Sequence, residues 1–419
     1  MKKILIIFIV LSGVKSFSQD LLINSIKIQG NKKTKTSLIL KITKAKQGMV
    51  LDSLVLEEDI RRLKRLPSVS HADFQVLDFQ DNSYDVLYTI KENLTIIPSV
   101  NIYTTNNDEF AFRVGINEFN LFGQNIAIGG FYQYDIYSSY AINFKAPYLF
   151  GKHFGLALNH QNLTTQEPLY FDNSTANYKY NNTSYEAVGL YEINLKNRIE
   201  LGVNFFSESY SFKFGDASPS IPQEFEVDKI LYKTSYEYSD IDYFYYFTSG
   251  FRSVFNFQYV TSKDSNISDF LIWYSDFYYY QRVGKKGNWA NKLRLGLSSN
   301  ENSPFAPFTL DNNINIRGVG NEIDRGTGAI IFNTEYRHTL FEKNWFVLQG
   351  NAFVDAGTWR NPGGELTDFT SSENIRVYPG FGLRFIHKKI YNAIFRIDYG
   401  FGITKNATNG FVIGIGQYF

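Results

Sequence analysis

The sequence lacks cysteine, has only 10 prolines in 419 residues, and contains no apolar run long enough for a transmembrane helix. Without cysteine the chain cannot form disulfides or carry an acyl group on an N-terminal cysteine. The absence of long apolar runs excludes a helical membrane protein. It leaves open a membrane barrel, whose strands show an apolar face only at every second residue. The formal charge of +1 argues against a nucleic-acid partner, because phosphate binding relies on concentrated lysine and arginine.

Motifs for catalysis and cofactor binding are also missing. The sequence has no G-x-S-x-G elbow and no phosphate-binding loop. Its histidines lack HExxH or paired metal-ligand spacing, and they are His71, His153, His160, His338 and His387. We therefore expect no enzyme, no catalytic residue, no metal site and no cofactor.

The N-terminal segment has the pattern of a secretory signal peptide. Lys2 and Lys3 precede the apolar run ILIIFIVL, and the small residues of SFSQ follow. We expect residues 1–18 to be the signal peptide, with cleavage near Ser18 or Gln19. A membrane anchor helix is the alternative, although the run falls short of the roughly 20 apolar residues that span a bilayer.

Residues 21–93 predict a small α+β domain. INSIKIQG alternates as a strand, TKTSLILKIT and DSLVLEEDIRRLKRL predict helices, and VSHADFQVLDF and YDVLYTIKE predict two more strands. Leu56, Ile60 and Leu63 share one face of the longer helix. The order strand, helix, helix, strand, strand resembles a POTRA domain, a periplasmic polypeptide-binding module. An unrelated α+β domain is the alternative for this segment alone.

Residues 94–419 predict an all-β membrane barrel. The chain is rich in aromatics, with 38 Phe and 30 Tyr, and period two replaces the helical period in about sixteen segments of roughly ten residues. In AIFRIDYGFG, for example, Phe395 and Ile397 share one face, whereas Arg396 and Asp398 share the other. We predict a transmembrane antiparallel barrel of about 16 strands, preceded by the small domain.

The predicted connections alternate between short and long. NLFGQ, YLFGK and LKNR are short turns, whereas residues 163–182, 213–228, 300–327 and 358–374 are predicted long connections. Short periplasmic turns and long external loops are typical of outer-membrane barrels. We therefore expect the long connections to lie on the side opposite to the small domain.

One long connection contains the stretch INIRGVGNEIDRG, with Arg317 among glycines. The alternation in the two following strands turns Glu335 and Asp355 toward the interior. A buried guanidinium needs carboxylate or carbonyl partners, because an unpaired charge away from water is costly. We predict that Arg317 folds into the lumen and pairs with Glu335 and Asp355, which locks the loop to the wall.

The segments IRGVGNE, NTEYRHTLF, FVDAGTW and PGFGLRF, followed by a last strand ending in Phe, resemble the BamA/TamA superfamily. That family also includes two-partner secretion transporters and patatin-linked barrels. The resemblance implies a sixteen-stranded barrel with periplasmic POTRA domains that inserts or secretes proteins. It identifies a lumen-loop motif, with Val319 in place of the usual aromatic, and a wall motif. These motifs are Ile316, Arg317 and Gly318, and Phe353, Asp355 and Gly357.

The first and last barrel strands contain residues that weaken backbone pairing. Pro98 in LTIIPSVNIY cannot donate to a ladder, and Gly414 and Gly416 lie in GFVIGIGQYF. We predict a seam, meaning a weakly paired junction, between these strands, although Pro98 can equally mark only a strand start. The last strand also resembles the insertion signal of outer-membrane barrels. Its alternation predicts the lipid-facing residues Phe411, Ile413, Ile415 and Phe419.

These features together imply an outer-membrane translocase or insertase in a Gram-negative-type bacterium. The POTRA-like domain would lie in the periplasm and bind unfolded clients by strand addition at VSHADFQVLDF. Expected partners are unfolded outer-membrane or secreted polypeptides, the lipid bilayer and periplasmic lipoproteins. A passive diffusion channel with a loop folded into its lumen is the alternative, and a structural or adhesion barrel is a third.

Overall fold

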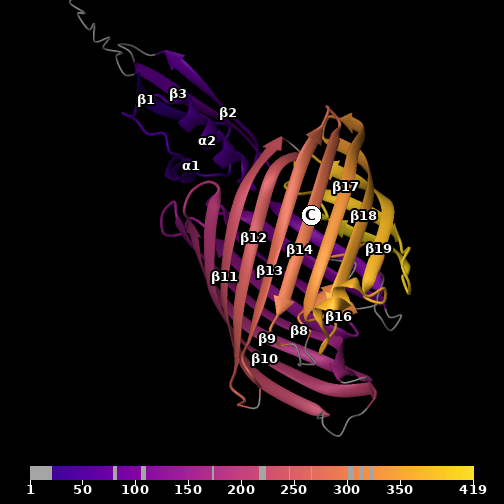
Figure 1. Cartoon of the computed structure of the whole chain (residues 1–419). Helices are drawn as coiled ribbons and strands as arrows, with labels where there is room; N and C mark the ends of the chain where they lie inside the picture. Colours follow the sequence, from indigo (N-terminus) through magenta and orange to yellow (C-terminus); the bar gives the residue numbers. More distant parts are fainter. Residues whose placement is uncertain are drawn as a thin grey trace, which may run out of the picture.

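A computed structural model gives the fold as a small domain next to one end of a large barrel (Figure 1). The structure describes residues 21–78, 83–104, 110–171, 174–216, 223–244, 246–265, 267–300, 306–310, 315–319 and 324–419. The predicted signal peptide lies outside the described residues. No helix in the described part of the chain is long and apolar enough to cross a membrane.

The small domain has the element order that the sequence predicts. Its elements are β1 (Leu22–Gln29), α1 (Thr36–Ile42), α2 (Ser53–Lys64), β2 (Val69–Asp78) and β3 (Ser83–Glu92). The sheet order is β1-β3-β2, with β1 parallel and β2 antiparallel to β3. Helix α2 begins where the side chain of Asp52 accepts a hydrogen bond from the Leu54 N–H, a typical N-cap. Because β3 is the central strand, β2 lies at an edge of this sheet.

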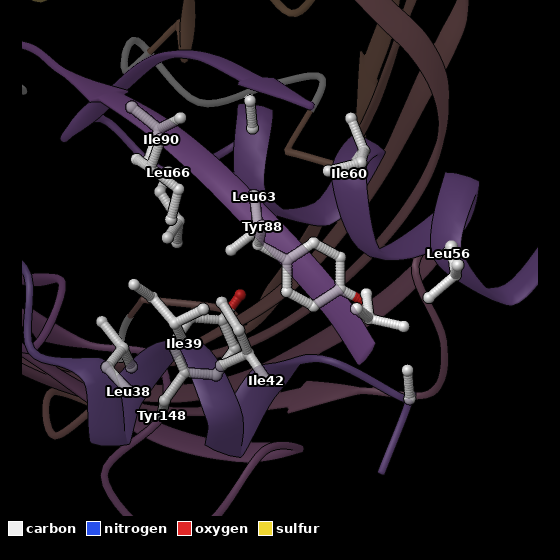
Figure 2. Packing of buried hydrophobic residues seen from close by; sticks show 14 of the residues in the cluster. Leu38, Ile39, Ile42, Leu56, Ile60, Leu63, Leu66, Tyr88, Ile90 and Tyr148 are labelled. Atoms are coloured by element: carbon white, nitrogen blue, oxygen red, sulfur yellow. The ribbon is translucent and has the colours of Figure 1, made fainter. Parts of the chain in front are cut away.

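The core of the small domain includes one residue from the barrel. Buried side chains of α1, α2 and the sheet pack together, and Tyr148 from a barrel turn packs among them (Figure 2). Tyr88 is fully buried, and its hydroxyl donates to the carboxylate of Asp59 at 2.8 Å. The two parts of the molecule thus share a hydrophobic cluster.

The barrel is a single antiparallel sheet of sixteen strands, as predicted. Its strands are β4 (Ile96–Thr104), β5 (Phe110–Leu121), β6 (Ile126–Asp135), β7 (Tyr137–Ala146), β8 (Phe154–Phe171), β9 (Ser174–Glu192), β10 (Asn197–Gly215), β11 (Glu224–Phe244), β12 (Phe247–Ser262), β13 (Phe270–Val283), β14 (Gly287–Ser298), β17 (Gly328–Lys343), β18 (Phe346–Arg360), β19 (Ile375–His387), β20 (Ile394–Phe401) and β21 (Asn409–Ile415). Between β14 and β17 the chain forms a separate pair, β15 (Phe308–Leu310) and β16 (Asp324–Gly326). The order of the sheet follows the chain from β4 to β21, and these two strands lie at its ends.

Period-two alternation sorts the barrel residues as expected. On β20, Phe395 is exposed on the outer face, whereas Arg396 and Asp398 are buried in the interior. The outer face is apolar along most strands, and the interior collects charged and amide side chains. Such a wall suits lipid outside and a polar lumen inside.

Strand replaces most of one predicted long connection and part of another. Strands β8 to β11 have 18 to 21 residues each, so β-structure covers most of residues 163–182 and part of residues 213–228. The prediction of long connections was therefore wrong there. In the structure asparagine and threonine side chains pair across β8 and β9, as Asn162 does with Thr183 at 3.0 Å. The extended strands reach away from the small domain (Figure 1).

Candidate functional site

Arg317 is the centre of the most deeply buried polar cluster in the lumen. It has no exposed surface, and its Nε and Nη2 donate to the two oxygens of Asp355 at 2.8 and 3.0 Å. Its backbone N–H donates to the same carboxylate at 2.9 Å, and its Nη1 donates to Glu335. The bidentate fork fixes both the position and the orientation of the loop. The predicted pairing of Arg317 with Glu335 and Asp355 is therefore present in the structure.

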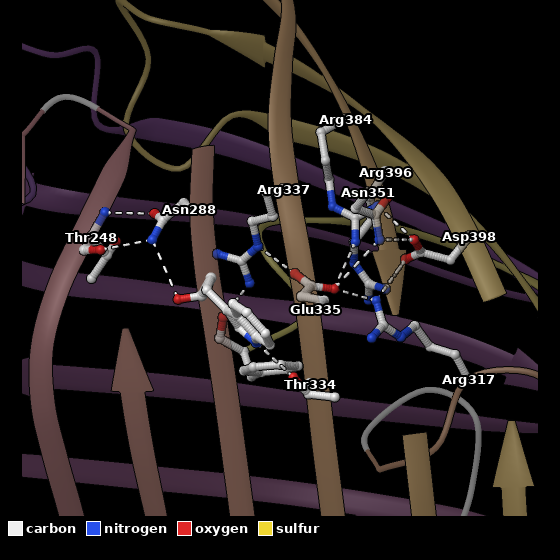
Figure 3. Close-up of polar contacts among 12 residues, drawn as sticks. Thr248, Asn288, Arg317, Thr334, Glu335, Arg337, Asn351, Arg384, Arg396 and Asp398 are labelled. Atoms are coloured by element: carbon white, nitrogen blue, oxygen red, sulfur yellow. Dashed lines mark hydrogen bonds and ion pairs between the residues drawn. The ribbon is translucent and has the colours of Figure 1, made fainter. Parts of the chain in front are cut away.

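The cluster extends beyond the predicted residues (Figure 3). Arg384 donates to Asp398 at 2.7 Å and to Glu335 at 3.4 Å, and Arg337 donates to Glu335. Asn351 donates to Asp398 at 3.2 Å. These side chains come from β17 to β20, whose inward positions lie side by side. The inward parity of Arg396 and Asp398 was readable from the sequence, but the ion pair of Asp398 with Arg317, at 3.7 Å, depends on the register between strands.

Two aromatic rings lie close to the Arg317 guanidinium. Its Cζ lies 3.6 Å from the ring centre of Phe353 and 4.3 Å from that of Tyr418. Cations are attracted to aromatic faces, and the attraction is stronger away from water. Phe353 of the predicted wall motif therefore stabilises the loop arginine directly.

Small residues allow the loop to approach the wall. A Cβ on Gly357 would lie 2.5 Å from Cδ1 of Ile316, and one on Gly318 would lie 2.9 Å from the backbone of Gly400. Gly318 also has a φ of +98°, which disfavours other residues. Ile316 and Val319 are buried in an apolar cluster with neighbouring wall residues. Val319, the departure from the family motif, thus has an apolar packing role.

The predicted lipid-facing side of the last strand is confirmed for three of its four residues. Phe411, Ile413 and Ile415 are exposed on the outer face. Phe419 lies inside instead, where it packs against a buried cluster and its backbone oxygen accepts from Arg337 Nη2 at 2.9 Å. The cause is Gly416, whose φ of +92° turns the chain out of the wall just after β21 ends. The prediction of an outward Phe419 was wrong.

Strands β4 and β21 lie at the two ends of the sheet, and their described residues form no ladder with each other. Pro98 lies within β4, where it pairs in register with Ile116 of β5. A Cβ on Gly414 would lie 2.8 Å from the Arg396 guanidinium, so this glycine leaves room for an inward arginine. A cavity of about 540 Å³ lies beside the junction. Gly416 is not part of the seam, because it follows the end of the strand.

The small domain is attached to the barrel turns by arginines of α2. Arg62 forms a buried ion pair with Glu192, and Arg61 pairs with Asp240. Arg65 donates to backbone oxygens of the same rim. Contacts also reach the NLFGQ, YLFGK and LKNR turns. These short turns therefore lie on the side of the small domain, as predicted.

One carboxylate of the small domain has a strongly altered acidity. Asp85 on β3 accepts side-chain hydrogen bonds from Lys27, Ser25 and Asn24 of β1. These bonds lower the pKa of Asp85 to about 2. The same contacts connect β1 to the centre of the sheet.

Among the residues that the structure describes, no group of three or more His, Asp or Glu side chains has a geometry that could hold a metal ion. The buried carboxylates of the lumen are instead paired with arginines. Ion pairs of this type fix the positions of the paired side chains and do not by themselves perform a reaction.

Comparisons with known proteins agree with this geometry. The POTRA family, described as a surface antigen variable number repeat, matches residues 21–93, and the Omp85 superfamily domain matches residues 120–419. BamA from Haemophilus ducreyi lacking POTRA domains 1–3 is similar in fold, with 16% identity and a TM-score of 0.54 over 94% of this chain and 83% of that one. CdiB from Acinetobacter baumannii has 15% identity and a TM-score of 0.64, over 95% and 74%. CdiB from Escherichia coli has 10% identity and a TM-score of 0.64, over 95% and 77%. The chain belongs to the Omp85 superfamily, as a sixteen-stranded barrel with one POTRA domain in front of it.

Proposed function

We propose that this protein moves polypeptides into or across the outer membrane. The POTRA domain would bind unfolded clients in the periplasm, and the barrel would insert or release them. No catalysis and no cofactor are part of this proposal.

The observation that carries the proposal is a shared cavity between the POTRA edge strand and the lumen. A cavity of about 480 Å³ is lined by Val69, Ser70 and His71 of β2 and also by Arg337 and Phe419. Strand β2 pairs only with β3 in the described part of the sheet, so its other edge is available for strand addition. A client bound along β2 would therefore begin at the entrance to the lumen.

The buried loop supports a barrel that is closed at rest. Arg317 holds its loop inside the lumen by a bidentate ion pair with Asp355. A passive diffusion channel would have no need of an attached POTRA domain. Opening of the closed barrel would require movement of this loop or of the junction between β4 and β21.

Cross-linking at β2 tests the proposal. A photo-reactive amino acid at Gln75, which is exposed on β2, should capture client polypeptides in cells. The matched control is Glu57, which is exposed on α2 away from the sheet edge. Equal capture at both positions, or none at Gln75, would contradict strand addition at β2.

Depletion of the protein in cells shows which outer-membrane or secreted proteins depend on it. Loss of one outer-membrane or secreted protein would identify a dedicated client, whereas loss of many would identify general assembly. An unchanged outer-membrane proteome, combined with steady ion conductance of the purified barrel, would favour a diffusion channel and overturn the proposal.

A further inference from the structure

Residues 417–419, called the inner segment below, leave the barrel wall and lie inside the lumen. The N–H of Gly416 donates to Ile394 at 2.7 Å, which fixes the turn. The ring of Tyr418 then lies over Arg317, at 4.3 Å, and over Arg396, at 4.8 Å. The inner segment therefore contacts the same arginine that holds the external loop.

Phe419 reaches the cavity at the POTRA end of the barrel. Its ring packs against a cluster formed by Ile241, Tyr280 and Ala290. Its backbone oxygen accepts from Arg337 Nη2 at 2.9 Å, and the guanidinium carbon lies 5.7 Å from its ring centre. Phe419 and Arg337 thus contact each other both through a hydrogen bond and through the aromatic ring.

The lining of the cavity is aromatic and basic. Its aromatic side chains are Tyr243, Phe244, Tyr246, Tyr280, Tyr391 and Phe419. Its cations are Lys64, Arg65, Arg252, Arg337 and Lys388, and its lining contains no Asp or Glu. Arg252, Arg337 and Lys388 pair with carboxylates that lie outside the lining. Arg65 donates only to backbone oxygens among the described residues. A ligand with aromatic rings, and with negative charge directed toward Lys64 and Arg65, would complement such a surface.

The inner segment is incompletely satisfied where it lies. Both polar atoms of the Gln417 side-chain amide are buried and have no hydrogen-bond partner in the described part of the chain. A buried amide without partners costs free energy. The position of the inner segment is therefore one that a better-matched peptide can displace.

We propose that this cavity is a binding site for an aromatic residue of the client polypeptide flanked by acidic side chains, and that Phe419 occupies it in the resting barrel. This inference rests on the proposed function and adds the chemical class of the client segment. Entry of a client aromatic would expel Phe419 and draw Tyr418 away from Arg317. Client binding would in this way loosen the loop at the other end of the lumen.

Peptide binding to the full-length protein in detergent micelles tests the site. The probe is the fluorescent pentapeptide Asp-Gln-Tyr-Phe-Asp, followed by anisotropy. Phe419→Ala should tighten binding about tenfold, because the apparent affinity rises with the fraction of sites that are free. The matched control is Phe381→Ala, an aromatic on the outer face, which should leave binding unchanged. A second probe, with alanine in place of its Tyr and Phe, should bind weakly to every variant.

Two further measurements keep the outcome decisive. If Phe419→Ala does not fold, a photo-reactive residue at Tyr243 in the otherwise unchanged protein should capture the probe, and the second probe, without Tyr and Phe, should not compete. Equal binding by wild type and a folded Phe419→Ala, or no capture at Tyr243, would overturn the inference. Failure of the site in a protein that still transfers clients refutes only this inference. Binding at the site without any client transfer in cells refutes only the proposed function.

Discussion

Removal of the Arg317 side chain should release the loop and leave the barrel folded. In Arg317→Ala, Glu335 keeps ion pairs with Arg337 and Arg384. Asp355 is different, because it has no exposed surface and, in the described part of the chain, its side-chain hydrogen bonds and ion pair are all with Arg317. The substitution therefore strands one buried carboxylate.

The magnitude follows from that stranded charge. Breaking a buried ion pair by removal of one partner costs about 3 to 5 kcal/mol. Because about 1.4 kcal/mol corresponds to a factor of ten, the released loop should become about 100-fold to 4000-fold more populated. The double variant with Asp355→Ala removes the stranded charge as well. It should recover about 0.5 to 3 kcal/mol of that loss, which is the usual coupling between contacting residues.

Hydrogen exchange read by mass spectrometry measures the effect in the peptide containing residues 315–319. Its exchange should accelerate strongly in Arg317→Ala and less in the double variant. Heat-modifiable migration on electrophoresis should show a folded barrel in both. Arg252→Ala is a suitable control, because this residue pairs with Glu237 at 2.8 Å away from the loop. Unchanged exchange in Arg317→Ala, or equal effects of the single and double variants, would refute the reasoning.

Three more predictions concern single sites. The pKa of Asp85 is lowered to about 2 from an ordinary value of 3.8. Its ionised form therefore stabilises the fold above pH 3.8, and this stabilisation is lost as the pH falls through 2. Asp85→Asn should remove this acid dependence from the hydrogen exchange of the β3 amides. Gly400→Ala should displace the loop without changing any charge, because its Cβ would lie 2.3 Å from the Arg317 carbonyl oxygen; Gly189→Ala, whose nearest contact is at 3.7 Å, is the control in the same exchange experiment. Arg62→Ala removes the buried ion pair with Glu192, which among the described residues keeps only its 3.5 Å pair with Arg198, so spin-label distances between POTRA domain and barrel should broaden.

Alternation in the sequence was sufficient to identify the partners of Arg317. Period two assigns every second residue of a strand to the lumen, which placed Glu335 and Asp355 on the inner face. The same rule could not predict the contact of Arg384 with Asp398, at 2.7 Å, because it depends on the stagger between β19 and β20. Register comes from the closure of the whole sheet, and no local pattern encodes it.

The lengths of the extended strands were not readable for a related reason. Asparagine and threonine favour turns when their side chains bond to nearby backbone. In β8 and β9 they bond across the ladder instead, as Asn181 does with Thr164 at 2.7 Å. Such a polar ladder needs a partner strand in register, so its sequence signal is the same as that of a loop until the partner is known.

The misplaced Phe419 leads to a last prediction, on Gly416. Parity alone continues β21 to the end of the sequence, but a φ of +92° at Gly416 ends the strand and turns the inner segment into the lumen. Gly416→Val should disfavour this turn by about 1 to 2 kcal/mol, because a left-handed backbone places Cβ against the following carbonyl. The fluorescence of a tryptophan introduced at Phe419 reports the result. A water-soluble quencher should quench this tryptophan to a different extent when position 416 is Val instead of Gly. Gly414→Val tests another effect, because its Cβ would lie 2.8 Å from the Arg396 guanidinium. Identical quenching with Gly and Val at position 416 would mean that packing around Phe419, and not the glycine, directs the segment inward.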